Sequence, residues 1–178
     1  MSRKLFIYIA TSLDGYIAKP NDDLDFLSIV EQEGEDYGYA DFIKTIDTVI
    51  LGRKTYDKVS TIDFDSPYSK KDTYVITRTP RLDSGLIKFY TDDFIELVTK
   101  LKSEKGKKNI FCDGGSEIIN ELLKHNLIDE FIISIIPVFI GNGTKLFKDG
   151  RPEQGLKLIS TKQFEKGLIQ LHYQRIDK

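Results

Sequence analysis

The chain has 178 residues, a formal net charge of −2 and a sequence pI near 5.8. This balance excludes a general attraction to nucleic acid or to an anionic membrane surface, so any anion-binding site has to be local. The single cysteine, Cys112, excludes an internal disulfide and fits a reducing compartment. No apolar run approaches the roughly 20 residues that a membrane span needs. We therefore expect one domain over residues 1–178, in the cytoplasm.

The first ninety residues alternate short apolar runs, which predict strands, with longer mixed runs, which predict helices. Between residues 23 and 47 the apolar groups have mixed spacing among many acids. We expect one or two helices there, interrupted near Gly34 or Gly38. The other expected elements are strands at 4–10, 47–52, 72–78 and 85–90 and a short helix at 53–59.

The second half of the chain predicts two further helices and four further strands. The first of these helices begins with acids and ends with lysines and a glycine, as the helix dipole favours. A break at Gly167 indicates that the last two strands form a hairpin. The expected elements are helices at 92–106 and 116–126 and strands at 108–113, 129–140, 155–164 and 168–176. Strands that alternate with helices predict an α/β fold, with a mostly parallel central sheet covered on both faces and an antiparallel C-terminal edge.

Three of the predicted strands end in groups that bind phosphate. Arg53 and Lys54 stand together where a strand meets a helix N-terminus, which already carries about half a positive charge. Two cations there repel the dipole and each other unless an anion binds. Thr77 and Arg78 follow the third strand, and the two glycines of "CDGGSEI" bring backbone amides to another helix start. Because ligands of parallel sheets bind outside the carboxyl ends of the strands, these ends predict a polyphosphate ligand, such as a dinucleotide with an extra phosphate.

Other nucleotide and metal motifs are absent from the sequence. It holds neither a G-x-x-x-x-G-K-[ST] loop nor a G-x-G-x-x-G fingerprint at the first strand. His125 and His172 lie far apart and outside any cluster with ligand spacing, so no metal site is predicted. The tripeptide "GNG" at Gly141–Gly143 comes late, after a strand, and is interpreted as a turn.

Five stretches occur in the order and spacing of the dihydrofolate-reductase-like superfamily. They are "IATSLDGYIA", "VILGRKTY", "YVITR", "IFCDGGSEIINELL" and "LIDEFIISIIPVFIGNGTKLF". Over nearly the whole chain they resemble most the reductase domain of the bifunctional riboflavin-biosynthesis enzymes and its small stand-alone relatives. The segment "PVFIGNGTKLF" is the one most specific to that branch. The resemblance implies a three-layer α-β-α fold with a central sheet of about eight strands, and an NADPH-dependent reductase activity.

The resemblance also implies where NADPH binds. Residues at the nicotinamide end would be Ala10 and Ile17. Residues at the pyrophosphate and the adenosine phosphate would be Gly52, Arg53, Lys54, Thr55, Thr77, Arg78, Asp113, Gly114, Gly115, Ser116 and Glu117, and the Gly114–Gly115 bond is cis in many relatives. The adjacent cations at 53 and 54 would match a phosphate charge of about −2, which favours NADPH over NADH.

The proton donor has several candidates. Folate reductases carry a carboxylate on the helix before "GR", and Asp36 lies at about that distance, although it also reads as a solvated acid in "EQEGED". Asp25 is a second catalytic candidate. Asp113 is a third: it takes the place of a glutamate common in riboflavin-type reductases, or it caps the following helix. Asp14 and the phenol of Tyr16 complete the set of candidate proton handlers.

Two features depart from the riboflavin-type pattern. Those reductases usually place a lysine after "DG" in the first loop, where it meets the substrate phosphate, and Tyr16 stands there in this chain. The segment "DFDSP" at residues 63–67 matches their acidic "D-x-P-x-L" segment only in part. Both departures concern the substrate, whereas the cofactor motifs are intact.

Three functions are compatible with these residues. The first is an NADPH-dependent reductase of a small heterocycle that resembles either 5-amino-6-(5-phosphoribosylamino)uracil or a pterin. The second is a true dihydrofolate reductase, which predicts tight binding of antifolates and a buried carboxylate on the first helix. The third is a nucleotide- or flavin-binding module without turnover. The apolar run Phe131–Ile140 is longer than one buried strand needs, and with the resemblance it favours a homodimer.

Overall fold

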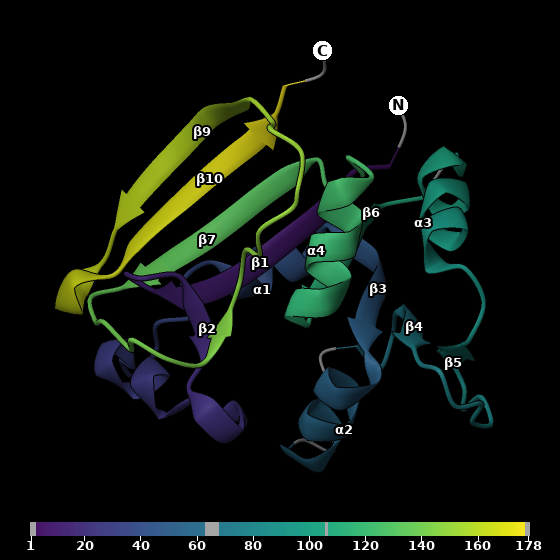
Figure 1. Cartoon of the computed structure of the whole chain (residues 1–178), viewed down its shortest axis with the longest axis horizontal. Helices are drawn as coiled ribbons and strands as arrows, with labels where there is room; N and C mark the ends of the chain where they lie inside the picture. The colour runs from purple at the N-terminus through teal and green to yellow at the C-terminus, as the bar shows by residue number, and fades with distance from the viewer. Residues whose placement is uncertain (1–2, 63–67, 106, 177–178) are drawn as a thin grey trace.

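An eight-stranded sheet organises the computed structural model, which describes residues 3–62, 68–105 and 107–176 (Figure 1). The strand order is β5-β4-β3-β6-β1-β7-β10-β9. Neighbouring strands from β5 to β7 are parallel, and β10 is antiparallel to both β7 and β9. The strands are β1 (Leu5–Ser12), β3 (Ile46–Gly52), β4 (Asp72–Ile76), β5 (Ile87–Tyr90), β6 (Asn109–Gly114), β7 (Glu130–Ile136), β9 (Leu156–Gln163) and β10 (Ile169–Arg175). The predicted α/β class, with its antiparallel C-terminal edge, is confirmed.

The central strands are continuous apolar runs because both of their faces are covered. Successive side chains of a strand point to opposite faces, so a strand buried on both sides needs apolar residues at every position. In β3, Val49, Ile50 and Leu51 are all fully buried. Ile50 packs in the core on one face of the sheet, while Val49 and Leu51 pack in the core on the other.

Helices cover both faces and complete the three layers. On one face, α3 (Phe94–Ser103) and α4 (Ser116–Lys124) pack in a single core with side chains of β1, β3 and β6. On the other face lie α1 (Tyr39–Lys44) and α2 (Arg53–Ile62). The short 3₁₀ helix η2 (Asp25–Val30) packs there against the end of β7. Figure 1 shows α4 in front of the sheet and α1 behind it.

The interruption expected between residues 23 and 47 is present. The helical segments η2 and α1 are separated by residues 31–38, in which Gly34 and Gly38 have φ angles of +78° and +89°. Positive φ is a conformation that glycine adopts without steric cost, so both glycines suit a segment that changes direction. The other predicted elements exist, with ends that differ by a few residues; the strand expected at 129–140 ends at Ile136.

A second, two-stranded sheet was not predicted. Strand β2 (Tyr16–Ala18) pairs antiparallel with β8 (Thr144–Lys145) and so fastens the first loop to the segment after β7. Gly143 lies at the point of closest approach, where a Cβ atom would lie 2.1 Å from the carbonyl oxygen of Ala18. Its φ of +140° is also unfavourable for residues with a side chain. The interpretation of "GNG" as a simple turn is therefore incomplete, because its last glycine is required by this backbone contact.

The C-terminal hairpin is confirmed. Strands β9 and β10 are joined through the short helix η3 (Glu165–Gly167) and pair along their length. Strand β9 forms the outer edge of the sheet, and all eight of its residues are exposed, including Leu156, Leu158 and Ile159. An exposed edge strand with apolar side chains is suited to pairing with another strand.

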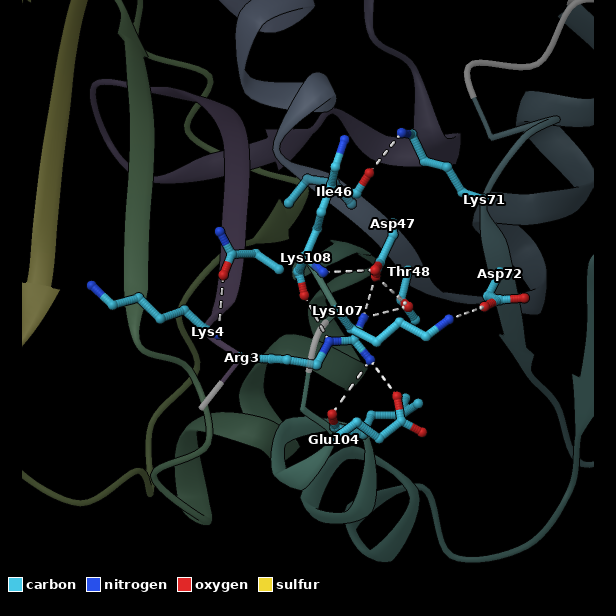
Figure 2. A network of polar contacts seen from close by, with 12 residues as sticks. Arg3, Lys4, Ile46, Asp47, Thr48, Lys71, Asp72, Glu104, Lys107 and Lys108 are labelled. Carbon is cyan, nitrogen blue, oxygen red and sulfur yellow. Dashed lines mark hydrogen bonds and ion pairs between the residues drawn. The ribbon is translucent and has the colours of Figure 1, made fainter. Parts of the chain in front are cut away.

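At the amino ends of the parallel strands, a buried arginine donates hydrogen bonds to several acceptors (Figure 2). Arg3 is only 3% exposed. Its guanidinium donates to the side chains of Asp47, Thr48 and Glu104, at 2.6 Å to the Thr48 hydroxyl and 2.7 Å to Glu104. The same group donates to backbone carbonyl oxygens of α3 and of the segment before β6. Arg3 therefore ties β1, β3 and α3 together.

Two further carboxylates at this amino-terminal edge are each shared by two basic groups. Asp129 lies 2.6 Å from the ammonium of Lys102 and 3.1 Å from the guanidinium of Arg175. The buried Glu130 contacts both Lys4 and the imidazole of His172. Cations and carboxylates thus compensate one another along this edge.

Candidate active site

The three strand ends with phosphate-binding motifs lie side by side in the structure. Gly52 at the end of β3 pairs with Ile76 of β4, and Leu51 pairs with Gly114 of β6. Thr77 and Arg78 follow β4 directly. Figure 1 shows α2 starting at the arrowhead of β3. Motifs that are more than 60 residues apart in the chain are therefore brought to one edge of the sheet.

Positive charge is in excess at this edge. Asp57 accepts from Arg53 at 2.8 Å, one helical turn earlier in α2, and from Arg81 at 2.6 and 3.2 Å. Hydrogen bonds from Arg81 in the first place, and from Arg53, lower the pKa of Asp57 although partial burial opposes the shift. Among residues 3–62, 68–105 and 107–176, neither Lys54 nor Arg78 has an ion-pair partner. Two of the four cations therefore share one carboxylate, and Lys54 and Arg78 add uncompensated positive charge.

The glycines beside these cations lie in close contact with other residues of this edge. A Cβ atom on Gly115 would lie 3.5 Å from the hydroxyl of Thr55, and a Cβ atom on Gly52 would lie 3.4 Å from the side chain of Ile118. The Thr55 hydroxyl has no hydrogen-bond partner within the part of the chain that the structure describes. The Gly114–Gly115 peptide is cis, as the resemblance implied. Bare backbone, a free hydroxyl and excess cations are the groups that hold a pyrophosphate, so these residues fit a phosphorylated dinucleotide.

Other predicted cofactor residues already have partners in the protein. The Ser116 hydroxyl donates to the carbonyl oxygen of Lys145 at 2.7 Å, which ties α4 to β8. The Thr77 hydroxyl donates to the carbonyl oxygen of Thr79 and accepts from its amide. Glu117, whose side chain is 86% exposed, pairs with Lys148. These three residues keep the predicted cofactor role as a hypothesis, and the structure gives each of them a local role as well.

A cavity of about 280 Å³ opens at the carboxyl ends of β1 and β7. Apolar side chains that include Leu27, Val30, Ile136 and Leu168 line it. Ala10, predicted at the nicotinamide end, also lines this cavity. Ile17 packs in the core on the α3–α4 face instead. Because β6 separates β3 from β1 in the sheet, the cavity lies next to the phosphate-binding edge and not on it.

A polar network lies along one wall of this cavity. The hydroxyl of Tyr8 donates to the carbonyl oxygen of Tyr37 at 2.7 Å. The amide nitrogen of Gln170 is within 3.0 Å of the Tyr8 hydroxyl and 3.2 Å of the Ser134 hydroxyl, and donates to both. Tyr8, Ser134 and Gln170 come from β1, β7 and β10, which are neighbours in the sheet. None of these residues was predicted from the sequence.

Two of the predicted catalytic carboxylates are exposed. Asp36 lines the cavity but lies in the segment before α1, and not on a helix. Its carboxylate accepts from the amides of Ala40 and Gly38, both at 2.8 Å, and these bonds lower its pKa. Asp25 at the start of η2 pairs with Lys19 at 2.5 Å and is not part of the cavity wall. An ionised, hydrogen-bonded Asp36 is a poor proton donor but a good acceptor for a substrate N–H.

Asp113 has the opposite environment. It ends β6 just before the cis peptide, and its carboxylate accepts from the Tyr68 hydroxyl at 2.6 Å. Burial raises the pKa of Asp113 to about 6, although the bond from Tyr68 opposes this. Tyr68 also hydrogen-bonds Tyr39, whose pKa burial raises to about 12. Asp113 therefore changes protonation near neutral pH.

The first loop is held closed by its own side chains. Burial would raise the pKa of Asp14, but hydrogen bonds from the Ser12 hydroxyl and from the amides of Ile140 and Gly141 lower it overall. Tyr16 donates to the carbonyl oxygen of Gly141 at 3.3 Å. Asp14 therefore joins the first loop to the segment after β7. The segment "DFDSP" at 63–67 lies outside the described residues.

The described ranges hold neither a cluster of metal-ligating side chains nor a membrane-spanning helix. Residues 3–62, 68–105 and 107–176 contain no group of three or more His, Cys, Asp or Glu side chains placed to hold an ion. No helix in these ranges is long and apolar enough to cross a bilayer.

The sheet order and the two helical layers define an α/β domain with the dihydrofolate-reductase-like fold. Residues 3–170 match the model of the RibD C-terminal domain, and the chain belongs to this family.

Individual relatives agree with this assignment. The chain is 45% identical to the uncharacterized protein YwjB of Bacillus subtilis (strain 168), over 98% of this chain and 99% of YwjB. It is 30% identical, with a TM-score of 0.86, to a solved structure from Shewanella sp. PV-4 that is only provisionally named a riboflavin biosynthesis protein, over 99% and 100% of the two chains. Dihydrofolate reductase from Enterococcus faecalis, solved with NADP(H), has a TM-score of 0.66 at 20% identity, over 99% and 100%, and shows the fold alone.

Proposed function

We propose that the protein is an NADPH-dependent reductase of a small heterocycle, of the riboflavin-precursor or pterin type. The observation that carries this proposal is the excess of positive charge at the carboxyl ends of β3 and β4, where Arg53 and Arg81 share the carboxylate of Asp57 and no ion pair to the described residues compensates Lys54 or Arg78. Such an excess of positive charge beside bare glycine backbone is suited to a phosphate-rich dinucleotide with an additional 2′-phosphate. Family membership and the dihydrofolate-reductase-like fold support the same conclusion.

When bound, NADPH supplies a hydride, and a reduced heterocycle also needs one proton. In our proposal the chain holds the cofactor phosphates at the ends of β3, β4 and β6, while the cavity beside β1 and β7 holds the substrate ring. Its apolar walls exclude water from the reacting face, which favours hydride transfer over side reactions. Asp113 has a pKa of about 6 but is not part of this cavity's lining, so a role as proton source would need a route to the ring that its contact with Tyr68 does not supply.

The two alternative functions are separable from this one. A true dihydrofolate reductase was expected to carry a buried carboxylate on the first helix. The only acid of α1 is Asp41, whose side chain is 88% exposed, so this observation disfavours that alternative. A nucleotide-binding module without turnover would bind NADPH but oxidise it with no pterin or aminopyrimidine.

We further propose that the protein is a homodimer. The sequence favoured a dimer because of the long apolar run Phe131–Ile140, which begins in β7. Both edges of β7 are paired within the sheet, with β1 and with β10, so β7 has no free edge for a strand of a second subunit. The unpaired outer strand β9, with Leu158 and Ile159 exposed by 49% and 45%, is the better candidate surface. Light scattering on a size-exclusion column should give twice the chain mass of 20.4 kDa, and Leu158→Lys should reduce it.

The experiment that tests the reductase proposal is direct binding of NADPH and NADH to the purified protein. We expect a preference for NADPH that Arg53→Ala reduces roughly 10- to 100-fold, the range for a hydrogen bond between charged groups. Lys124→Ala is the matched control, because Lys124 is an exposed cation at the far end of α4. Equal binding of both nucleotides would contradict the phosphate assignment, and binding of neither would contradict the reductase.

A further inference from the structure

The charge of the substrate cavity differs from what a phosphorylated substrate requires. Among the described residues that line it, Glu31 and Asp36 are the charged ones, and none is Lys, Arg or His. Lys166 comes near, because its ammonium donates to the backbone carbonyl oxygen of Glu31, but it is not part of the lining. A phosphate in this cavity would meet negative charge without a compensating cation.

The negative charge of Asp36 persists at neutral pH, because the pKa of its carboxyl is lowered. The amides of Ala40 and Gly38 stabilise the carboxylate form of Asp36 and lower its pKa. A carboxylate has more acceptor sites than these two amides use, so Asp36 can still accept hydrogen bonds from a ligand. Amino groups and protonated ring nitrogens are the ligand groups that match it.

A hydrogen-bond donor, in contrast to these acceptors, is present on the sheet side of the cavity. The Ser134 hydroxyl, which belongs to a residue only 4% exposed, accepts from Gln170. Its own hydrogen has no acceptor among the residues that the structure describes. Because the Tyr8 hydroxyl already donates to Tyr37, Ser134 is the group in this wall with a hydrogen to offer. A ring nitrogen or carbonyl oxygen of a ligand would satisfy it.

We propose that this cavity binds a planar heterocycle that carries both amino and oxo groups and no phosphate. The amino side faces Asp36 and Glu31, the oxo side accepts from Ser134, and the ring lies between apolar side chains such as Leu27 and Ile136. This inference rests on the proposed function and narrows its substrate to the unphosphorylated class. It also explains why Tyr16, bonded to Gly141, can stand where phosphate-binding relatives have a lysine.

The test is binding without any nucleotide, measured by calorimetry with three probes. They are pterin, 5-amino-6-(ribosylamino)uracil and the 5′-phosphate of the latter. We expect pterin to bind, and the uracil to bind at least tenfold more tightly than its phosphate. Equal or tighter binding of the phosphate would overturn the proposal, and so would failure of both unphosphorylated probes to bind.

Variants assign the effect to individual side chains. Asp36→Asn should weaken pterin binding roughly tenfold and narrow the difference in affinity between the two uracils. Glu31→Gln should act in the same direction, and this second variant leaves the bonds from the Gly38 and Ala40 amides to Asp36 in place. Asp41→Asn, which removes an exposed acid of α1, is the matched control and should change neither value. A tenfold loss of the phosphorylated probe in Lys166→Ala would show that a cation does recruit phosphate, and would contradict the proposal.

The experiments can refute the proposed reductase activity and the proposed cavity ligand independently of each other. Binding of the unphosphorylated probes without binding of NADPH would refute the reductase and leave the cavity assignment standing. Binding of NADPH together with a preference for the phosphorylated uracil would leave the reductase standing and refute the cavity assignment.

Discussion

The two edges of the central sheet handle charge differently. At the amino ends of the parallel strands, Arg3 is buried among Asp47 and Glu104, and Asp129 and Glu130 each serve two basic groups. At the carboxyl ends, Arg53 and Arg81 share Asp57, while Lys54 and Arg78 have no ion pair to the described residues. A buried ion has to be paired within the chain, whereas an exposed and underpaired cluster is free to bind an anion from solution. Charge at the first edge therefore serves the fold, and charge at the second serves binding.

The largest effect is expected on stability, from removal of the buried arginine at the amino ends of the parallel strands. Arg3→Ala leaves Asp47 and Glu104 without their partner, and the loss of one member of a buried ion pair costs about 3–5 kcal/mol of unfolding free energy. Urea denaturation measures this change. The folded fraction should retain the preference for NADPH over NADH, since Arg3 lies at the other end of the strands. A loss below about 1 kcal/mol would mean that the pair is compensated by solvent.

The pH dependence of stability is the next largest effect. The pKa of Asp113 is raised in the folded state, so the folded protein binds more protons than the unfolded chain and its stability falls as pH rises from about 4 through 6. Between pH 4.5 and 7.5 this costs about 2 kcal/mol. Asp113→Asn should not show this fall in stability, because the amide does not ionise. Its oxygen still accepts from the Tyr68 hydroxyl, so the contact is kept. The check is the difference in unfolding free energy between the two proteins at both pH values; a constant difference would contradict the raised pKa.

A smaller effect is expected at the carboxyl ends of the parallel strands. There a variant should change the affinity for NADPH and leave the stability almost unchanged. Arg81→Ala should weaken NADPH about tenfold, or about 1.4 kcal/mol, and leave NADH within about twofold. Its ion pair with Asp57 is exposed, so unfolding free energy should change by less than about 1 kcal/mol. Titration of nucleotide fluorescence measures both affinities.

Asp57→Asn is the complementary variant, because it removes the carboxylate that competes with an incoming phosphate. NADPH should then bind severalfold more tightly at low salt, and the gain should shrink as salt screens the cluster. Weaker binding in this variant would mean that Asp57 positions the two arginines more than it competes.

The smallest effect is expected from Glu117→Gln. Its pair with Lys148 is largely exposed, so the unfolding free energy should change by less than about 0.5 kcal/mol. NADPH affinity should rise or stay constant, since a carboxylate near a pyrophosphate repels it. A clear loss of NADPH affinity would support the contact that the family resemblance implied.

Local motifs made the fold and the phosphate-binding edge predictable. An apolar run followed at once by glycine and cations, as at Gly52 and Arg53, places the end of a strand, the start of a helix and a charge within a few residues. The parallel arrangement then brings such ends together without further information. The break near Gly34 and Gly38 and the C-terminal hairpin follow from local signals in the same way.

Partners that are distant in the chain were not predictable. Arg81 meets Asp57 across 24 residues, and Gln170 reaches Tyr8 across 162. Nothing in the composition around these residues marks them, because their roles depend on which strands are neighbours. For Asp36 the local signal was misleading. Its spacing along the sequence from Gly52 suggested a carboxylate on a helix, whereas it lies exposed in the segment before α1.

The tripeptide "GNG" illustrates how differently two glycines of one motif tolerate change. Gly141 has a positive φ but open space around its Cα, so asparagine or aspartate could replace it at modest cost. Gly143 lies against the backbone of β2, where even one carbon would overlap the Ala18 oxygen. In a library randomised at both positions and selected for folding, position 141 should return several residue types and position 143 glycine alone.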